Sequence, residues 1–332
     1  MSVVAFDGAC FGDGPVTGVG RAFTDGLRVY AETNARECVL LVPEGAVAPE
    51  LPGVRAVAAP RGRWRRQRQL PGLLQRLGAS LLHSSVASVP LAAPCPTIAT
   101  AHDLPWLHPE AMERTSWWRR AATTRALRGA ACVLAPSTMT QRDVAGLVAA
   151  HDTRVELVPH GVARPSLAPL PASERQGPLL VLGDDRPRKN RSAVREAYAQ
   201  FARARGDAPP LRFVGPPDDY VDEREKHALL RTCRAVVHAS RFEGFGLPVL
   251  EALAHGAPLL CSDLEPLREV AGDVARYVDP NDVGSIAAGL EAIDCDDDLR
   301  AAQVAAGPDR AAAFSLQRLA DSWRRVHAEV SR

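Results

Sequence analysis

The feature that most constrains this chain is the stretch from Arg234 to Gly256, which contains a strand, a glycine-rich loop and a helix in succession. The apolar run 235–238 predicts a buried strand, and the loop 240–246 follows it directly. Pro248 favours a helix start at this point, and Gly256 favours its end. A helix that begins after a glycine loop presents backbone N–H groups and the positive end of its dipole, so this junction suits an anion.

Two carboxylates bracket this junction. Glu243 lies in the loop, and Glu251 lies two turns into the predicted helix. A carboxylate repels a phosphate placed against it, so we expect both to accept hydrogen bonds from hydroxyls at the two ends of a ligand whose middle is phosphate. A nucleotide-sugar has this form: a ribose diol, a diphosphate and a hydroxylated sugar. The structural alternative for either residue alone is a loop brace for Glu243 and a surface arginine partner for Glu251.

The whole stretch resembles the donor-binding signature of the family 4 retaining glycosyltransferases, E-G-F-G-L-P-x-x-E followed by A-x-x-x-G-x-P-x-x-x-S. The matching residues are Glu243, Gly244, Phe245, Gly246, Leu247, Pro248, Glu251, Ala252, Gly256, Pro258 and Ser262. The match extends over roughly forty residues, which makes it far more specific than a lone glycine motif. The resemblance implies that a nucleotide-sugar donor contacts Glu243, Gly244, Phe245, Gly246, Leu247 and Glu251.

Strands alternate with helices in both halves of the 332-residue chain, which predicts an α/β protein of two domains. The resemblance implies the GT-B fold, two Rossmann-like domains with a cleft between them. We expect an acceptor domain over residues 1–165, a proline-rich linker over 166–178 and a donor domain over 179–314. In the fold that the chain resembles, the final helix, here 315–332, packs back on the first domain.

A basic loop follows the strand predicted for 179–182 and resembles the family element G-x-x-x-P-R-K-N. Lys189 matches the family lysine that contacts the donor diphosphate. The family arginine that often follows the first glycine is Asp184 here, and we consider Arg186 as its substitute. A cation is needed because the leaving group is an anionic nucleoside diphosphate. The alternative is a solvated basic turn without a ligand.

The first half carries a glycine-rich turn between residues 8 and 20, after the first predicted strand. The segment from Thr17 to Arg21 resembles the family's G-I-G-R-Y element. The resemblance places Gly18 and Gly20 near the donor phosphate and the acceptor. The glycines do not fit the G-x-G-x-x-G spacing, so the residues alone also allow a flexible turn without a ligand.

His102 and Asp103 follow the strand predicted for 97–101, and the family carries H-D-L at this place. Ligands bind beyond the carboxyl ends of strands in open α/β sheets. The resemblance places His102 near the transferred sugar and both residues at the acceptor, whereas a lone histidine is otherwise usually structural. The segment 159–162 resembles the family turn P-N-G-V, with His160 in place of the asparagine.

The composition argues against several other classes of partner. The 40 basic and 39 acidic residues leave a net charge of +1, which gives no general field for nucleic acid. The seven cysteines include no C-x-x-C pair, so we expect buried thiols in a reducing cytoplasm and no zinc site. We expect neither a signal peptide nor a membrane span. The local patch Arg61–Arg68 around Trp64 indicates either an anionic surface or acceptor as partner, or a solvated arginine face of a helix.

These features predict a retaining glycosyltransferase that moves a sugar from a nucleoside-diphosphate sugar to a hydroxyl acceptor, without a metal ion or other cofactor. The resemblance assigns His102, Lys189 and Glu243 to the reacting centre. Two alternatives stay open. A phosphorylase or synthase of the same fold would use phosphate or a sugar phosphate. A catalytically inactive partner would bind the nucleotide-sugar without turning it over, and the departure at Asp184 is consistent with that alternative.

Overall fold

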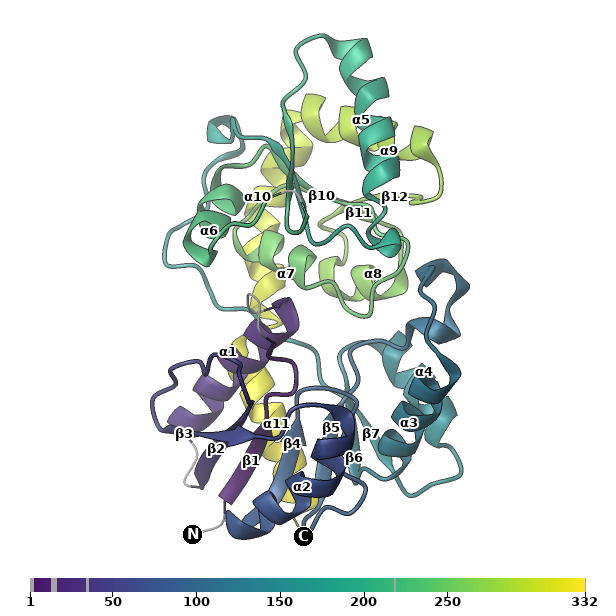
Figure 1. The fold of residues 1–332 in the computed structure, drawn as a ribbon. Helices are drawn as coiled ribbons and strands as arrows, with labels where there is room; N and C mark the ends of the chain where they lie inside the picture. Colours follow the sequence, from purple (N-terminus) through teal and green to yellow (C-terminus); the bar gives the residue numbers. More distant parts are fainter. Residues whose placement is uncertain (1–2, 13–16, 34–35, 218, 332) are drawn as a thin grey trace. The chain divides into compact units, whose positions relative to one another are not determined.

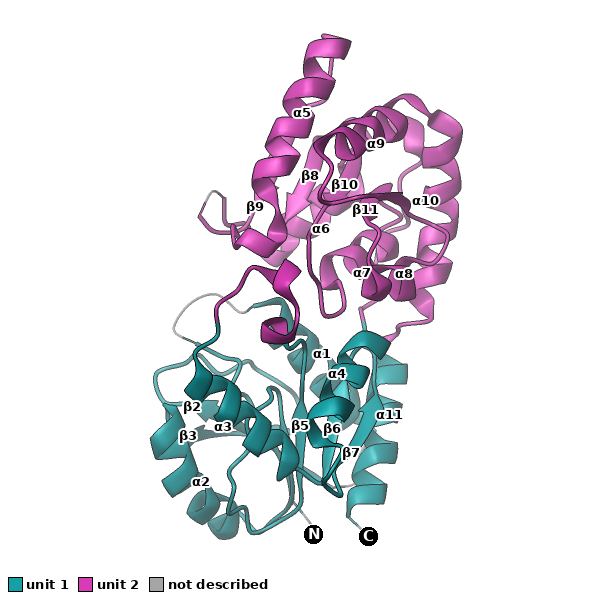
Figure 2. Ribbon diagram, turned by 90° about the vertical axis from the view of Figure 1, so that its right-hand side faces the viewer, with its two compact units in different colours: residues 1–104, 115–161, 316–332 teal, residues 105–114, 162–315 magenta. Residues whose placement is uncertain are grey.

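The computed structural model describes residues 3–12, 17–33, 36–217 and 219–331, and these form two compact units (Figure 2). Unit 1 comprises residues 1–104, 115–161 and 316–332, and unit 2 comprises residues 105–114 and 162–315. Each unit contains its own β-sheet flanked by helices (Figure 1). Among the described residues, no helix combines the length and the hydropathy that a membrane crossing requires.

Unit 1 is built on a seven-stranded sheet in the order β3-β2-β1-β4-β5-β6-β7. All neighbouring strands in it are parallel. The strand order reverses between β1 and β4, the place at which open α/β sheets bind ligands. The strands are β1 (Val3–Asp7), β2 (Glu37–Pro43), β3 (Val54–Ala59), β4 (Ala79–Ser84), β5 (Thr97–Thr100), β6 (Cys132–Ala135) and β7 (Arg154–Leu157).

Helices cover both faces of this sheet. They are α1 (Gly18–Glu32), α2 (Arg63–Arg76), α3 (Trp117–Arg128), α4 (Thr138–Val148) and α11 (Leu316–Val330). Successive strand residues point to opposite faces, and both sets are apolar in β1. Val4 and Phe6 pack in one cluster with α1 and α11, whereas Val3 and Ala5 pack in another with α2.

The carboxyl-terminal helix α11 is an integral part of unit 1. It lies along α1 (Figure 1), and a Cβ atom at Gly26 would lie only 2.8 Å from the Trp323 ring. The absence of a side chain at Gly26 therefore allows the two helices to approach closely. Leu319 and Trp323 are buried in the same cluster as Phe6.

Unit 2 contains a five-stranded sheet in the order β12-β11-β10-β8-β9, again with parallel neighbours. The strands are β8 (Leu179–Leu182), β9 (Leu211–Val214), β10 (Ala235–His238), β11 (Leu259–Ser262) and β12 (Arg276–Val278). The helices are α5 (Arg191–Arg205), α6 (Glu223–Thr232), α7 (Leu247–Ala254), α8 (Glu265–Ala271), α9 (Val283–Cys295) and α10 (Asp297–Ala312).

The two faces of the second sheet have separate hydrophobic cores. Leu180 and Val236 pack in a cluster with residues of α7 and α8, and Leu179 and Val237 pack in a cluster with residues of α5 and α9. The strands are therefore apolar on both sides, as expected for a parallel sheet covered by helices. The reversal of strand order lies between β8 and β10.

The units differ from the boundaries that the sequence predicts in two places. Residues 105–114, inside the expected first domain, cluster with unit 2. Residues 162–178, which include the expected linker, also belong to unit 2. The buried Arg175 side chain donates hydrogen bonds to the carbonyl oxygens of Leu170, Leu230 and His255. The proline content of 166–178 favours a spacer between domains. The buried Arg175 guanidinium instead anchors this segment to unit 2.

The seven cysteines are free thiols, and Cys38, Cys132, Cys233 and Cys261 are buried. Burial raises the pKa of Cys132 and of Cys233 to about 12. The Cys132 and Cys233 thiols therefore stay protonated at neutral pH and serve as small apolar side chains, as the sequence suggests. Cys10 and Cys95 are only partly buried and Cys295 is exposed, so the expectation of burial does not hold for these three.

A hydrogen-bonded chain of polar side chains crosses the core of unit 1. The Tyr30 hydroxyl and His327 Nδ1 are 2.9 Å apart, and His327 Nε2 and His83 Nδ1 are 3.0 Å apart. Burial lowers the pKa of His83 to about 3, and burial with the nearby His83 lowers the pKa of His327 well below its usual value. Both imidazoles are therefore neutral in the folded protein, and they connect α1, β4 and α11.

These buried imidazoles should make unit 1 sensitive to acid. Their folded pKa values lie below the unfolded value, so the unfolded chain binds more protons and stability falls as the pH drops below about 6.5. For His83 alone the loss between pH 7 and pH 5 is about 2 kcal/mol. The free energy of unfolding in urea, measured at both pH values, should show this slope. His327→Gln should be less stable but less pH-dependent, and the exposed control His151→Gln should keep the parental slope. A parental slope in His327→Gln would contradict the assignment.

Candidate functional site

The candidate site of unit 2 lies where its strand order reverses. β8 and β10 are neighbours there, and the loops 183–190 and 239–246 leave their carboxyl ends. Two loops that diverge from adjacent parallel strands form the usual ligand crevice of such sheets. Both of the sequence motifs predicted for the donor therefore meet at one edge of one sheet.

Asn190 holds the first of these loops against the second. Its backbone has a φ of 58°, a left-handed conformation that asparagine tolerates better than most residues. Its side-chain amide donates hydrogen bonds to the carbonyl oxygens of Ala239, at 3.0 Å, and Pro280, at 2.7 Å. The short helix η4 (Pro187–Lys189) is thereby fixed facing the loop after β10. This explains why the basic loop ends in asparagine.

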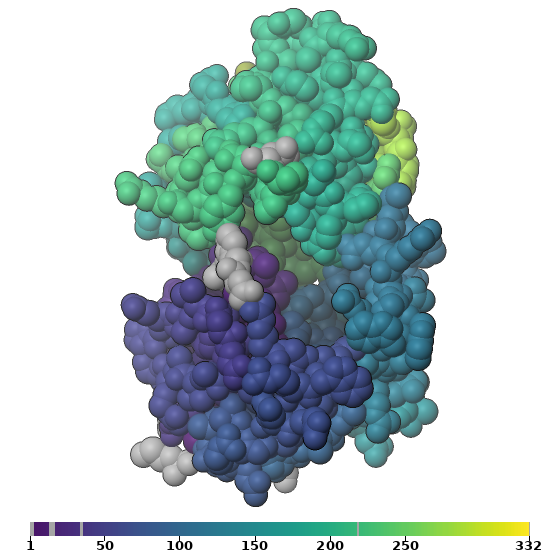
Figure 3. All heavy atoms as spheres, in the orientation of Figure 1, coloured from purple at the N-terminus to yellow at the C-terminus, as the bar shows by residue number. Residues whose placement is uncertain are grey.

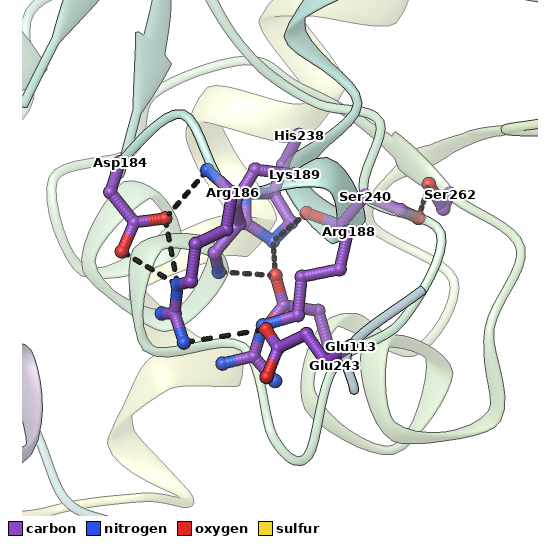
Figure 4. Close-up of polar contacts among 9 residues, drawn as sticks. All are labelled: Glu113, Asp184, Arg186, Arg188, Lys189, His238, Ser240, Glu243 and Ser262. Carbon is purple, nitrogen blue, oxygen red and sulfur yellow. Dashed lines mark hydrogen bonds and ion pairs between the residues drawn. The ribbon is translucent and has the colours of Figure 1, made fainter. Parts of the chain in front are cut away.

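Lys189 and Glu243 meet directly between these two loops (Figure 4). Lys189 Nζ lies 2.7 Å from Glu243 Oε1, and His238 Nε2 lies 2.8 Å from the same oxygen. Burial opposes ionisation of Glu243, but Lys189 and His238 hold its pKa well below the usual range. The carboxylate is therefore ionised, almost fully buried and firmly positioned, and His238 donates to it through Nε2–H.

Arg186 lies in the loop after β8, where it pairs with two carboxylates. Its Nε lies 2.8 Å from Asp184 Oδ2, and its Nη1 lies 3.5 Å from Glu113 Oε1 (Figure 4). Burial opposes ionisation of Asp184, but Arg186 and Lys189 lower its pKa below the usual value. Asp184, which stands where the family has an arginine, therefore forms an ion pair with Arg186, the residue considered as the substitute for that arginine.

The amino terminus of α7 directly follows the second of these loops. Gly246 adopts a φ of 105°, and a Cβ atom there would lie 2.5 Å from Leu267 Cδ2, so only glycine fits this helix cap. Leu247 begins the helix and Pro248 follows in its first turn. The Phe245 side chain is buried in the hydrophobic core, which fixes the loop while its backbone remains at the helix start. Gly244 precedes it in this loop.

Glu251 lies in the middle of α7 and pairs with a residue that the sequence did not predict as its partner. Lys226 of α6 places its Nζ 2.6 Å from Glu251 Oε1 and 2.9 Å from Glu223 Oε2. The lysine side chain is buried, whereas that of Glu251 is one-fifth exposed. Lys226 therefore holds an accessible carboxylate in a fixed orientation, which is what recognition of a diol requires.

Sequence reasoning missed His238, Lys226 and Glu113. His238 ends β10, so the rule that sites lie at carboxyl ends of strands would have found it. Lys226 is distant in sequence from Glu251, and Glu113 is distant from Arg188, so no motif spacing connects either pair.

In unit 1, His102 lies beyond the carboxyl end of β5 as predicted. Its Nε2 donates a hydrogen bond to the Ser85 carbonyl oxygen at 2.8 Å, and its Nδ1 lies 3.0 Å from His160 Nε2. Burial lowers the pKa of His102, against the opposing effects of the Ser85 carbonyl and Asp103. A neutral imidazole with its proton on Nε2 accepts at Nδ1, so His160 donates there. Both ring nitrogens are engaged, and His102 suits contact and positioning better than proton transfer.

The predicted glycine turn lies near this histidine pair. Thr17 caps α1 by accepting a hydrogen bond from the Gly20 N–H at 3.2 Å, and Gly18 is the first residue of the helix. A small cavity in unit 1 is lined by Val19, His102 and His160 among others. Residues 13–16 of the glycine-rich turn lie outside the described residues. Across the described part of the chain, no three histidine, cysteine or acidic side chains gather as a metal site.

Comparison with known families accounts for both units. Residues 27–164 match the model described as Glycosyltransferase Family 4, and residues 218–310 match the model described as Glycosyl transferases group 1. The chain belongs to the family 4 glycosyltransferases. The two matches include His102, Asp103, Glu243 and Glu251, and they leave the Lys189 loop outside.

Curated mannosyltransferases show similarity to the chain over parts of their length. The O-antigen chain mannosyltransferase B of Escherichia coli is 33% identical over 164 residues, which cover 43% of each chain. The phosphatidyl-myo-inositol mannosyltransferase of Mycolicibacterium smegmatis is 31% identical over 205 residues, 52% of each chain. The chain therefore matches about half the length of these relatives.

Solved structures of glycosyltransferases share the fold over nearly the whole chain. Sucrose-phosphate synthase from Thermosynechococcus elongatus has a TM-score of 0.79 at 16% identity and covers 99% of both chains. HepE from Anabaena, in complex with UDP and glucose, has a TM-score of 0.72 at 16% identity and covers 99% of this chain and 100% of its own. WaaG, a glycosyltransferase involved in lipopolysaccharide biosynthesis, has a TM-score of 0.72 at 16% identity and covers 97% of this chain and 99% of its own. The fold is GT-B, as the sequence predicts.

The Lys189–Glu243 pair should be measurable as an energetic coupling. Lys189→Met leaves the buried Glu243 carboxylate with one partner fewer, so we expect a loss of about 2–4 kcal/mol in the free energy of unfolding. The double variant with Glu243→Gln should recover part of that loss, because no unpaired buried charge remains. Urea unfolding of the four proteins of this cycle measures the coupling. Arg186→Met, in a half-exposed pair, should change stability by less than about 1 kcal/mol. A coupling of zero within error would contradict the assigned contact.

Proposed function

We propose that this chain is a metal-independent, retaining glycosyltransferase that moves a sugar from a nucleoside-diphosphate sugar to a hydroxyl acceptor. The observation that carries the proposal is the meeting of Lys189, Glu243 and the start of α7 at the switch point of unit 2. One cation and one helix amino terminus suit a diphosphate, and two fixed carboxylates suit hydroxyl groups. HepE of Anabaena, which shares the fold, forms complexes with UDP and with UDP-glucose, and the relatives include mannosyltransferases, which supports a nucleotide-sugar donor.

In the proposed reaction, the bond between the anomeric carbon and the diphosphate oxygen breaks while the acceptor oxygen bonds the same face of the sugar. The acceptor proton passes to the departing phosphate oxygen. Lys189 and the amino terminus of α7 stabilise the negative charge that develops on the leaving group. Glu243 and the backbone of residues 244–246 hold the sugar hydroxyls, and Glu251 holds the ribose diol. Arg186 contacts the diphosphate. The donor phosphate and the acceptor lie near Gly18 and Gly20, and the acceptor contacts His102 and Asp103.

Two variants test these roles. Glu251→Ala and Lys189→Ala should each lower kcat/KM by about 100-fold or more, because a fixed partner of the donor is lost. The control Glu223→Ala removes the other carboxylate on Lys226 and should stay near parental activity. Turnover is measured as sugar transfer and as donor hydrolysis, after a thermal-shift panel of UDP-, GDP-, ADP- and dTDP-sugars has identified the donor. Folded variants with near-parental turnover in both positions would overturn the assignment.

The same assay separates the alternatives. Product formation that requires free phosphate or a sugar phosphate would favour a phosphorylase or synthase. Donor binding without transfer or hydrolysis would favour an inactive partner.

We infer further that unit 1 contacts an anionic surface through the tryptophan face, defined as Trp64, Trp117 and Trp118 with Arg63 and Arg119. Trp64 is 82% exposed and Trp117 is 79% exposed. The guanidinium groups of Arg63 and Arg119 lie 5.5 and 5.2 Å from the centroid of the Trp118 ring, which brings the starts of α2 and α3 together. The blue segments that contain these helices lie at the surface (Figure 3). Exposed tryptophan beside arginine is typical of contacts with lipid headgroups.

Part of the basic patch has an internal role. Arg65 pairs with Glu44 at 2.8 Å, and the Arg66 guanidinium contacts the buried Asp7 carboxylate. The surface contact therefore rests on the tryptophan face rather than on the arginine run 61–68 as a whole.

Vesicle co-sedimentation tests this contact. The protein should bind vesicles that contain anionic phosphatidylglycerol more strongly than pure phosphatidylcholine vesicles, and added salt should weaken binding. Trp64→Ser with Trp117→Ser should reduce binding by about tenfold, since two exposed indoles are lost. Val47→Ser removes another exposed apolar side chain and should bind as the parent does. Equal binding of all three proteins would reject the surface.

A further inference from the structure

Residues 105–114 form a strap on unit 2 (magenta in Figure 2), although both neighbouring segments belong to unit 1. The strap contains the short helices η1 (Pro105–Leu107) and η2 (Pro109–Ala111). Ala111 is buried, the ring of His108 lies 4.9 Å from that of Phe242, and Arg241 Nη1 lies 3.4 Å from Met112 Sδ. The strap therefore contacts the loop after β10, next to Glu243.

The end of the strap places a carboxylate among the cations of the loop after β8. Glu113 Oε1 lies 3.1 Å from Arg188 Nε and 3.5 Å from Arg186 Nη1 (Figure 4). The Arg188 guanidinium is buried and lies 5.9 Å from the centroid of the Phe242 ring. Two guanidinium groups around one oxygen form an anion site, and here the anion belongs to the protein itself.

Each cation of this loop faces a carboxylate, and the three carboxylates are not equally easy to displace. Glu243 is buried and held by both Lys189 and His238. Asp184 is on the same loop as Arg186, only two residues away. Glu113 comes from a separate segment and its side chain is one-quarter exposed. Its Oε1 atom lies close to both arginines but meets the geometry of a hydrogen bond with neither, so the attraction of opposite charges holds it rather than a directed hydrogen bond.

The backbone beside Glu113 also favours release. Met112 has a φ of 53°, a left-handed conformation that costs energy for a residue other than glycine. Among the described residues, Met112 and Asn190 are the non-glycine residues with positive φ, and Asn190 has two side-chain hydrogen bonds that stabilise it there. Met112 is half-exposed and directs Glu113 toward the arginines. The strained turn persists because the strap is docked.

We propose that Glu113 is a displaceable counter-anion of the diphosphate site. A diphosphate group replaces its carboxylate on Arg186 and Arg188, and the strap of residues 105–114 is freed from unit 2. When the nucleoside diphosphate leaves, Glu113 returns and neutralises the two arginines. The inference rests on the proposed function, since the diphosphate is that of the donor and of the product. The Glu113 carboxylate competes with the diphosphate group for the two arginines. It therefore weakens binding of both the donor and the nucleoside-diphosphate product, so product release becomes easier.

Affinity measurements test the displacement. Isothermal titration in EDTA would use inorganic pyrophosphate and then UDP, GDP, ADP and dTDP, with the parent, Glu113→Gln and Glu110→Gln. Glu113→Gln removes the competing charge, so the best-binding of these probes should bind about threefold to tenfold more tightly. Glu110 lies on the same strap and contacts His108 at 3.2 Å rather than the arginines, so Glu110→Gln should bind as the parent does. Equal or weaker affinity in Glu113→Gln would overturn the proposal.

Hydrogen–deuterium exchange of the parent provides a second, independent readout. Saturation with the bound diphosphate should speed amide exchange in residues 105–116 by about threefold or more, because the strap loses its ionic anchor. In Glu113→Gln the same peptide should exchange faster without ligand. Slower or unchanged exchange in the parent on binding would show that Glu113 keeps its place, and would also overturn the proposal.

The outcomes separate this inference from the proposed function. If the parent binds a nucleoside diphosphate but Glu113→Gln shows no gain, the glycosyltransferase assignment stands and the counter-anion is rejected. If the parent binds neither pyrophosphate nor any of the four nucleotides, the proposed function fails and the displacement fails with it.

Discussion

The ion pair between Lys189 and Glu243 is the interaction on which the site of unit 2 depends. It joins the loop after β8 to the loop after β10, and His238 adds a second donor to the same carboxylate oxygen. Buried charges cost desolvation energy unless they have close partners, so neither residue tolerates loss of the other without penalty. The pair therefore fixes both loops while keeping a cation and a carboxylate at the switch point of the sheet, where ligands bind.

Balanced charge is the common property of this site. Asp184 offsets Arg186, Glu243 offsets Lys189, and Glu251 offsets Lys226. An array of unpaired cations around a crevice would repel itself and destabilise the folded state. A ligand that carries both phosphates and hydroxyl groups can bind to these paired charges. Its phosphates replace carboxylates as partners of the cations, and its hydroxyl groups replace cations as partners of the carboxylates. The same arrangement explains why the departure from the family arginine at position 184 leaves a structured loop.

Much of the fold could be predicted because each element carries a local signal. The apolar runs of β1, β8 and β10 predict buried strands, and Ser137 and Asp296 cap α4 and α10 as their residue types favour. Helix α8 was not predicted, since seven residues with Pro266 near the start give little periodicity. The segment 166–178 was expected to be a linker, but Arg175 buries its guanidinium and anchors it to unit 2. Composition reports average behaviour, and one buried side chain can override it.

The sequence by itself determined the family, the two-unit α/β architecture and the donor motif, because these follow from local periodicity and from residue types at fixed spacing. It also identified Lys189, Glu243 and Glu251 as the residues of interest. Only the tertiary structure decided their partners. The pairing of Glu251 with Lys226 and the approach of Glu113 to Arg188 join residues far apart along the chain. Charge interactions depend on distance in space, and spacing along a chain does not specify that distance until the sheets and helices have packed.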